Sequence, residues 1–182
     1  MIVTQYRIFC DDYILYDSDL NEFQLGNPVL KQELNMVDEL SFTIYSNHPY
    51  FNNISKLSSI IKVFRNDNLL FKGRVINSEL GFRNEKKIVC EGVLAFLLDT
   101  IIRPFDFPND EQFSDFDPDE NNAIEYFLNW ILNCHNSQAK DFQKIQLGKV
   151  TVTDPNNYLS RSSIEYLSSW EVINSRLLKS YG

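Results

Sequence analysis

The sequence is 182 residues long, with 43% hydrophobic and 14% aromatic residues, so it can form a packed core and is not a disordered chain. Its 25 acidic and 17 basic side chains give a formal net charge of −8, which argues against binding nucleic acid through a broad basic face. The longest apolar run, from Val93 to Leu98, is far too short to span a membrane.

The first half of the chain shows the alternation of apolar and polar residues that is typical of half-buried β-strands. A turn at Asp11-Asp12 predicts a short hairpin, and Asn66-Asp67-Asn68 predicts a tight turn between two later strands, because Asn and Asp tolerate a positive φ. Gly73 lies inside a strand, which indicates a β-bulge or a close approach of two backbones. The predicted strands cover residues 6–10, 13–16, 28–34, 40–45, 60–65, 69–76 and 86–92.

After Gly92 the hydrophobic period changes from that of strands to that of helices. Residues 93–98 predict a short buried helix, because they are helix formers with too little polarity for an exposed strand. A strand is predicted over residues 148–153, and residues 158–166 are ambiguous, with a further strand as one reading. A final helix is predicted from Ser168.

A longer helix is predicted between these segments. Asp117 can cap its start, Pro118 suits its first turn, and Glu120 completes a capping box. Apolar residues at helical spacing continue the pattern to about Cys134.

Two histidines are the only side chains that could act as ordinary bases at neutral pH. We interpret His48 as a turn residue that bonds nearby backbone, and His135 as a cation that complements the dipole at a helix end. The widely spaced cysteines Cys10, Cys90 and Cys134 lie among apolar residues, and we interpret them as buried free thiols. The sequence contains no serine-hydrolase, zinc-protease or nucleotide-binding motif.

Acidic residues are concentrated in and after the irregular stretch at residues 104–116. They are Asp106, Asp110, Glu111, Asp115, Asp117, Asp119 and Glu120. A solvated acidic loop explains them best, because an EF-hand would need a glycine and a terminal Glu that are missing here. A cation site is the alternative. We therefore predict no catalytic residue, no metal site and no cofactor.

Several short motifs follow one another in an order that is informative when they are taken together. They are Leu15-Tyr16-Asp17, Glu33-Leu34-Asn35, residues 40–44, His48-Pro49-Tyr50-Phe51, residues 69–75, residues 87–100, Arg103-Pro104, residues 148–152 and residues 166–178. In this order they resemble the N-terminal hub region of the phage minor structural protein family, which covers tail-associated lysins and prophage endopeptidase-type tail proteins. The resemblance spans nearly the whole chain, and Val37-Asp38-Glu39 departs from it where a small or glycine-containing turn is expected.

The resemblance implies an α+β protein similar to the central baseplate hub of contractile-tail phages. It implies a tail-tube-like antiparallel β-barrel or sandwich at residues 1–92, a helical flank at residues 93–140, and the start of a second small α+β domain at residues 141–182. Such a hub is a structural, homotrimeric virion protein that closes the distal end of the tail tube. It contacts the distal tail protein and the tape measure protein.

The same resemblance implies where the protein is made and where it acts. It would be synthesised in the bacterial host cytoplasm and then sit at the distal tip of the phage or prophage tail. It would not be an enzyme, and any peptidoglycan hydrolase would lie beyond Gly182.

Two other functions are compatible with the residues themselves. A cell-wall hydrolase could use paired carboxylates from residues 106–120. A carbohydrate-binding host-recognition domain could stack sugars on exposed aromatic side chains such as Phe105, Phe107 and Phe113.

Overall fold

The computed structural model describes residues 4–20, 23–154 and 156–179. The chain divides into two compact units, with the boundary between Leu94 and Ala95. Antiparallel sheet dominates the first unit, while short helices and short strand pairs make up the second. No helix of the described part is long and apolar enough to cross a membrane.

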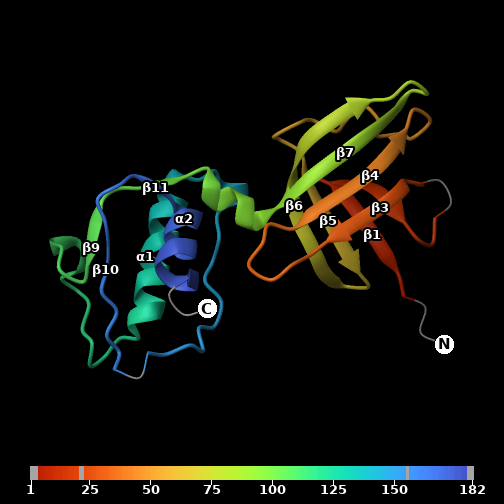
Figure 1. The fold of residues 1–182 in the computed structure, drawn as a ribbon. Helices are drawn as coiled ribbons and strands as arrows, with labels where there is room; N and C mark the ends of the chain where they lie inside the picture. The colour runs from red at the N-terminus through yellow and green to blue at the C-terminus, as the bar shows by residue number, and fades with distance from the viewer. Residues whose placement is uncertain (1–3, 21–22, 155, 180–182) are drawn as a thin grey trace. The chain divides into compact units, whose positions relative to one another are not determined.

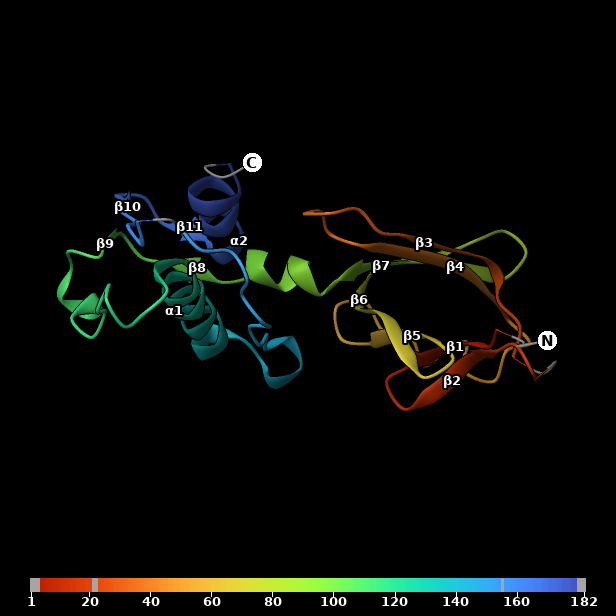
Figure 2. The ribbon, with the colours of Figure 1, turned by 90° about the horizontal axis from the view of Figure 1, so that it is seen from below.

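The first unit is built on a seven-stranded antiparallel sheet with the strand order β2-β1-β5-β6-β7-β4-β3. Its strands are β1 (Tyr6–Cys10), β2 (Tyr13–Asp17), β3 (Gly26–Lys31), β4 (Glu39–Tyr45), β5 (Ile60–Arg65), β6 (Asn68–Leu80) and β7 (Glu85–Gly92). Figures 1 and 2 show this sheet curling into a half-barrel, with β3, β4 and β7 on one side and β1, β2 and β5 on the other. The seven strands predicted for residues 6–92 are thus all present, and the fold is of the broad α+β class.

Strand β3 ends earlier than predicted. Lys31 pairs with Glu39, the first residue of β4, so residues 32–34 have no partner strand to continue the ladder. Leu34 is instead exposed in the β3–β4 loop.

Strand β6 belongs to both halves of the sheet. Its first part pairs with β5 and its second part with β7, and the register shifts between Val75 and Asn77. A β-bulge bends its strand, and this one lies two residues beyond Gly73. Gly73 fulfils the other prediction made for it, because a Cβ there would collide with the carbonyl oxygen of Glu91 on β7.

The core of the half-barrel follows from the strand period of two, which sends alternate side chains to its inner face. On β4 and β7, for example, Leu40 is paired with Cys90 and Phe42 with Ile88, and all four are buried. The other members of this core include Ile8, Cys10, Leu15, Ile44, Ile61, Val63, Phe71 and Val75.

The second unit packs helices and short strand pairs around an aromatic core. A 3-10 helix (Val93–Leu98) precedes it, and its Ala95, Phe96 and Leu97 are buried, as the predicted short buried helix requires. The other elements are β8 (Ile101–Ile102), β9 (Phe105–Phe107), a 3-10 helix (Glu111–Phe113), α1 (Ala123–Gln138), a 3-10 helix (Asp141–Gln143), β10 (Arg161–Ser163), β11 (Leu167–Ser168), α2 (Ser169–Ile173) and a π-helical turn (Asn174–Leu178). Strand β10 pairs with β9, and β11 pairs with β8.

The predicted start of α1 is wrong. The helix begins at Ala123, and its cap is Asn122, whose side-chain oxygen accepts hydrogen bonds from the backbone N–H groups of Ile124 and Glu125. Asp117 caps a separate turn, because its carboxylate accepts from the N–H of Asp119 at 2.8 Å. The end of the helix, at Gln138, is also one turn later than predicted.

Residues 148–153 do not form the predicted strand, because no strand lies beside them in the described part of the chain. The predicted final helix is confirmed, with Ser168 as its cap and Glu171 completing the capping box. Val172 and Leu177 from this end of the chain share one core with Phe127 and Ile131 of α1. Residues 95–182 therefore form one unit in which the expected flank and the expected second domain are packed together.

Candidate functional site

His48 is a structural residue of the half-barrel. It is buried, its Nε2 lies 3.0 Å from the carbonyl oxygen of Leu15 on β2, and its Nδ1 accepts from the backbone N–H of Tyr50 at 3.1 Å. The predicted bond to nearby backbone is present at Tyr50, while Leu15 is distant in sequence. Nε2 must carry the proton to donate to a carbonyl, so the ring is neutral, and burial lowers the pKa of His48 below its usual 6.5.

His135 lies in the last turn of α1, as predicted, but its ring is held inside the protein. It is fully buried, with Nε2 at 3.1 Å from the carbonyl oxygen of Gln143 and Nδ1 at 2.8 Å from Oγ1 of Thr100. Thr100 Oγ1 lies 2.8 Å from Oγ of Ser169. The Gln143 carbonyl can only accept, so Nε2 donates to it, and Nδ1 and the hydroxyls of Thr100 and Ser169 continue this chain of hydrogen bonds.

A hydroxyl beside an imidazole is also the beginning of a nucleophile–base pair. Thr100, His135 and Ser169 are all buried, however, so a substrate cannot reach them. The chain of bonds instead ties β8, α1 and α2 together inside the second unit.

Cys10 and Cys90 have the predicted character, whereas Cys134 is less buried than predicted. All three are free, Cys10 and Cys90 are buried, and Cys134 is half-buried. Burial raises the pKa of the Cys10 thiol to about 11 and raises that of Cys90 further. Such thiols are poor nucleophiles, because the thiolate is the reactive form.

The acidic stretch is bonded mostly to itself. Asp110 accepts from the backbone N–H of Asp106 at 2.7 Å and from the side chain of Gln112 at 3.1 Å. Among the described residues no group of three or more His, Cys, Asp or Glu side chains is placed to hold a metal ion. The carboxylates of Asp106, Asp110 and Asp117 accept hydrogen bonds within their own turns.

The aromatic residues proposed for sugar stacking are not exposed, so that prediction is wrong for them. Phe105, Phe107 and Phe113 are buried in the core of the second unit, where the ring of Phe107 packs edge-to-face on Phe113. Phe105 and Phe113 also contact Trp130 of α1. The sequence places these rings in an acidic loop, and only the tertiary structure shows that they turn inward.

The half-barrel is open between its two edge strands, and an apolar slot of about 270 Å³ lies between its two halves. Tyr6, Ile8 and Tyr16 of β1 and β2 line one side, with Val63 and Leu70, and Leu30 of β3 lines the other. The slot exists because β2 and β3 are the two ends of the strand order and, within the described residues, do not pair with each other.

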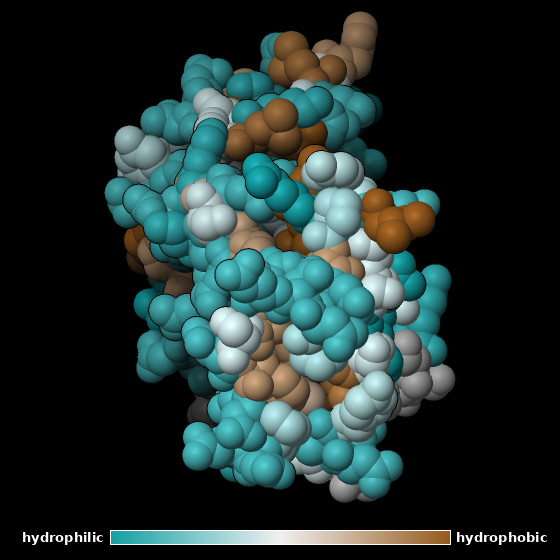
Figure 3. Space-filling model, turned by 90° about the vertical axis from the view of Figure 1, so that its left-hand side faces the viewer, coloured by the Kyte–Doolittle hydropathy of each residue, from teal (hydrophilic) through white to brown (hydrophobic). Residues whose placement is uncertain are grey.

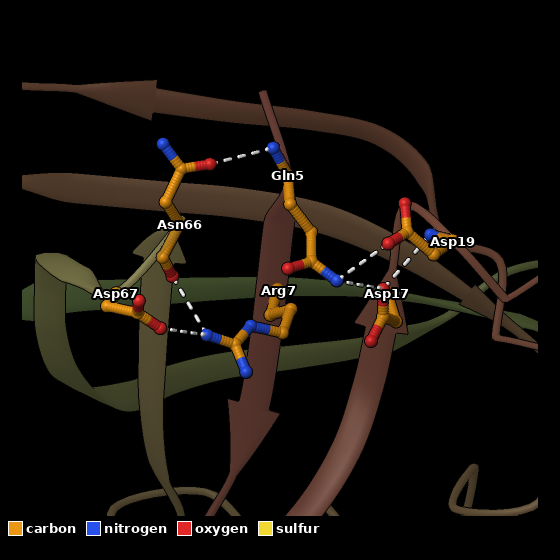
Figure 4. Close-up of polar contacts among 6 residues, drawn as sticks. All are labelled: Gln5, Arg7, Asp17, Asp19, Asn66 and Asp67. Carbon is orange, nitrogen blue, oxygen red and sulfur yellow. Dashed lines mark hydrogen bonds and ion pairs between the residues drawn. The ribbon is translucent and has the colours of Figure 1, made fainter. Parts of the chain in front are cut away.

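A cluster of polar side chains lies beside the slot, at the ends of β1, β2 and β5, and its contacts are drawn in Figure 4. The amide of Gln5 donates to the carboxylates of Asp17 at 3.3 Å and Asp19 at 2.9 Å. Arg7 forms an ion pair with Asp67 at 3.1 Å. In the part of the chain that the structure describes, Asp17 and Asp19 accept hydrogen bonds from uncharged donors only, so their negative charge is not compensated.

Apolar side chains also lie open to solvent at the surface. Figure 3 shows one face of the molecule, where brown apolar patches interrupt the polar surface. The most exposed large apolar residues are Phe82, Ile164, Leu34, Tyr158, Tyr166 and Leu80. A contiguous exposed apolar patch marks an interaction site, whereas apolar residues exposed singly are normal.

No protein-family model matches the chain, and no curated protein matches its sequence. The open slot and the free strand edges beside it are therefore the features from which a function can be argued.

Proposed function

We propose that the chain is a structural component of a phage or prophage tail tip, a hub that closes the distal end of the tail tube. One observation carries the proposal: the sheet of the first unit is an open half-barrel with two free edges. A free edge presents unpaired backbone N–H and C=O groups, and proteins cover such edges or pair them with other chains.

Strand β3 is the more exposed of the two edge strands. Asn27, Pro28, Val29 and Lys31 are exposed, although they belong to the largest sheet of the chain. An edge strand whose residues are this exposed to solvent is stabilised when another subunit packs on it. Repeated around a symmetry axis, such contacts build a ring.

The remaining observations agree with an assembly role. Both histidines have structural partners inside the protein, and the thiols are held in their protonated form. As a hub, the protein would be a homotrimer, would bind the distal tail protein and the tape measure protein, and would be found in the virion.

The test is to express the full-length protein together with the distal tail protein encoded beside it. Light scattering after size-exclusion chromatography should give the mass of a trimer, and the two proteins should elute together as rings visible in electron micrographs. A chain that stays monomeric at every concentration, and that elutes apart from a correctly folded distal tail protein, would refute the proposal.

A further inference from the structure

The turn between β6 and β7 carries a fully exposed phenylalanine. Phe82 has a relative exposure of 103%, and Leu80 beside it is exposed by 66%. The backbone that presents Phe82 is well fixed: Gly81 N–H donates to the carbonyl of Glu85 at 2.7 Å, and Asn84 N–H donates to that of Gly81 at 3.3 Å. A fully exposed aromatic side chain on a hydrogen-bonded turn can bring a large apolar area into an interface.

The apolar slot is large enough to accept this side chain. An apolar cavity of about 150 Å³ takes up a benzene molecule, and the slot measures about 270 Å³. Its lining by Tyr6, Tyr16 and Leu30 offers aromatic and aliphatic surface to a phenyl ring.

The part of the β6–β7 turn that carries Leu80 and Phe82 is called the tip. The tip and the slot lie at opposite ends of strand β6. Leu70 at the start of β6 lines the slot, and Leu80 at its end belongs to the tip. Figure 1 shows the β6–β7 turn at the upper end of the first unit and the β5–β6 turn at its lower end. One copy therefore cannot fill its own slot, but it can fill the slot of the next copy.

Arg83 on the β6–β7 turn carries a charge opposite to that of the two aspartates beside the slot. Arg83 follows Phe82 and is exposed, and it forms no ion pair within the described residues. Asp17 and Asp19 stand beside the slot and are uncompensated, while Arg7 is already engaged by Asp67. Arg65, exposed at the end of β5, is the second cation at that end.

We propose that Phe82 of one copy of this chain inserts into the slot lined by Tyr6, Tyr16 and Leu30 of a second copy, with Arg83 facing Asp17 and Asp19. The contact is heterologous, since two different patches meet, and a heterologous contact closes into a ring when its rotation permits. It rests on the assembly role proposed above and names the residues that would join neighbouring subunits.

Two variants of the full-length protein test the contact. Phe82→Asp removes the tip and leaves the slot, and Leu30→Trp fills the slot from the exposed strand β3 and leaves the tip. Each should weaken self-association in sedimentation velocity by about 30-fold or more, as loss of an interface hot spot does. Circular dichroism should show that both variants remain folded.

Mixing the two variants gives the sharper result. The intact tip of Leu30→Trp can enter the intact slot of Phe82→Asp, so the mixture should form one-to-one dimers and nothing larger. Leu34→Asp is the matched control, because Leu34 is equally apolar and 91% exposed but lies in the β3–β4 loop. This control should assemble like the unchanged protein.

The outcomes separate this contact from the assembly role itself. If Phe82→Asp assembles like the unchanged protein and still binds the distal tail protein, the contact is wrong and the hub role stands. If the unchanged protein neither assembles nor binds the distal tail protein, the hub role falls and the contact falls with it.

Discussion

Arg74 and Glu91 face each other across strands β6 and β7, and both Nε and Nη2 of Arg74 lie 2.6 Å from Oε1 of Glu91. Their side chains are only 15% and 23% exposed. Arg74 is therefore an ion-paired arginine. The pair joins the two strands directly beside the bend of β6, where the ladder is interrupted by the register shift.

Replacing Glu91 by Ala should destabilise the first unit by about 1.5–3 kcal/mol, because hydrogen bonds to charged groups are the stronger ones and the guanidinium stays behind half-buried. Urea unfolding measures the change. Glu39→Ala is the control, since its pair with Lys31 is exposed by 47% and 65% and should contribute less than about 1 kcal/mol. Equal losses for the two variants would contradict the assigned role of the Arg74–Glu91 pair.

Gly73→Ala should destabilise the protein by about 1–3 kcal/mol. The added Cβ would collide with the backbone carbonyl of Glu91 and with the ring of Phe71, and the backbone cannot yield as a side chain can. Gly148→Ala provides the comparison, because a Cβ there meets nothing within 4 Å. Thermal unfolding of both variants should show a clear loss for the first and no loss for the second.

His48 should make stability depend on pH. Its pKa in the folded protein is lowered below the 6.5 of the unfolded chain, so its stabilising effect is full above about pH 6.5. As the pH falls below that value, His48 binds a proton in the unfolded chain but not in the folded protein. The free energy of unfolding therefore decreases until the pH reaches the pKa of His48 in the folded protein.

Urea unfolding between pH 7.5 and pH 5 measures this loss, with His48→Gln as the comparison. The variant lacks the titrating ring, so its stability should fall less steeply over the same range, whatever its stability at pH 7.5. Identical slopes would show that His48 is not held neutral by its burial.

Thr100→Val should cost the second unit about 1–3 kcal/mol, because it leaves Nδ1 of His135 and the hydroxyl of Ser169 buried without their partner. The change keeps the shape of the side chain, so packing is preserved. Thr151→Val, at an exposed position, should be nearly neutral. A neutral Thr100→Val would mean that the chain of bonds does not hold the unit together.

Thiol reagents should distinguish the cysteines. Cys10 and Cys90 are buried and their pKa values are raised, so both should resist modification at pH 7.5 in the folded protein. Cys134 is half-buried and should react first. Mass spectrometry of the modified protein should therefore show at most one rapid addition before denaturant is added and three afterwards.

The strands could be predicted because they are local in origin. The alternation at Leu40, Phe42 and Ile44 specifies an element with one buried face, and the turn at residues 66–68 specifies the connection between two strands. The capping box of Ser168 and Glu171 is equally local, and it was predicted correctly.

The start of α1 could not be predicted in this way. The sequence pattern indicated a cap at Asp117, whereas the helix is capped by Asn122, which residues far along the chain contact. Asn157 accepts from the N–H of Ala123, the first residue of the helix, and Val152 accepts from the side chain of Asn122. A capping motif of four residues contains no information about hydrogen-bond partners that lie thirty residues away.

Local patterns in the sequence were enough to predict the seven strands of the first unit, the turns between them and the free, buried thiols of Cys10 and Cys90. The bonding of His135 inside a core, the inward direction of Phe107 and the open sheet between β2 and β3 depend on the tertiary structure. Hydrophobic period and turn chemistry act over a few residues, whereas burial and edge pairing depend on what the rest of the chain brings alongside.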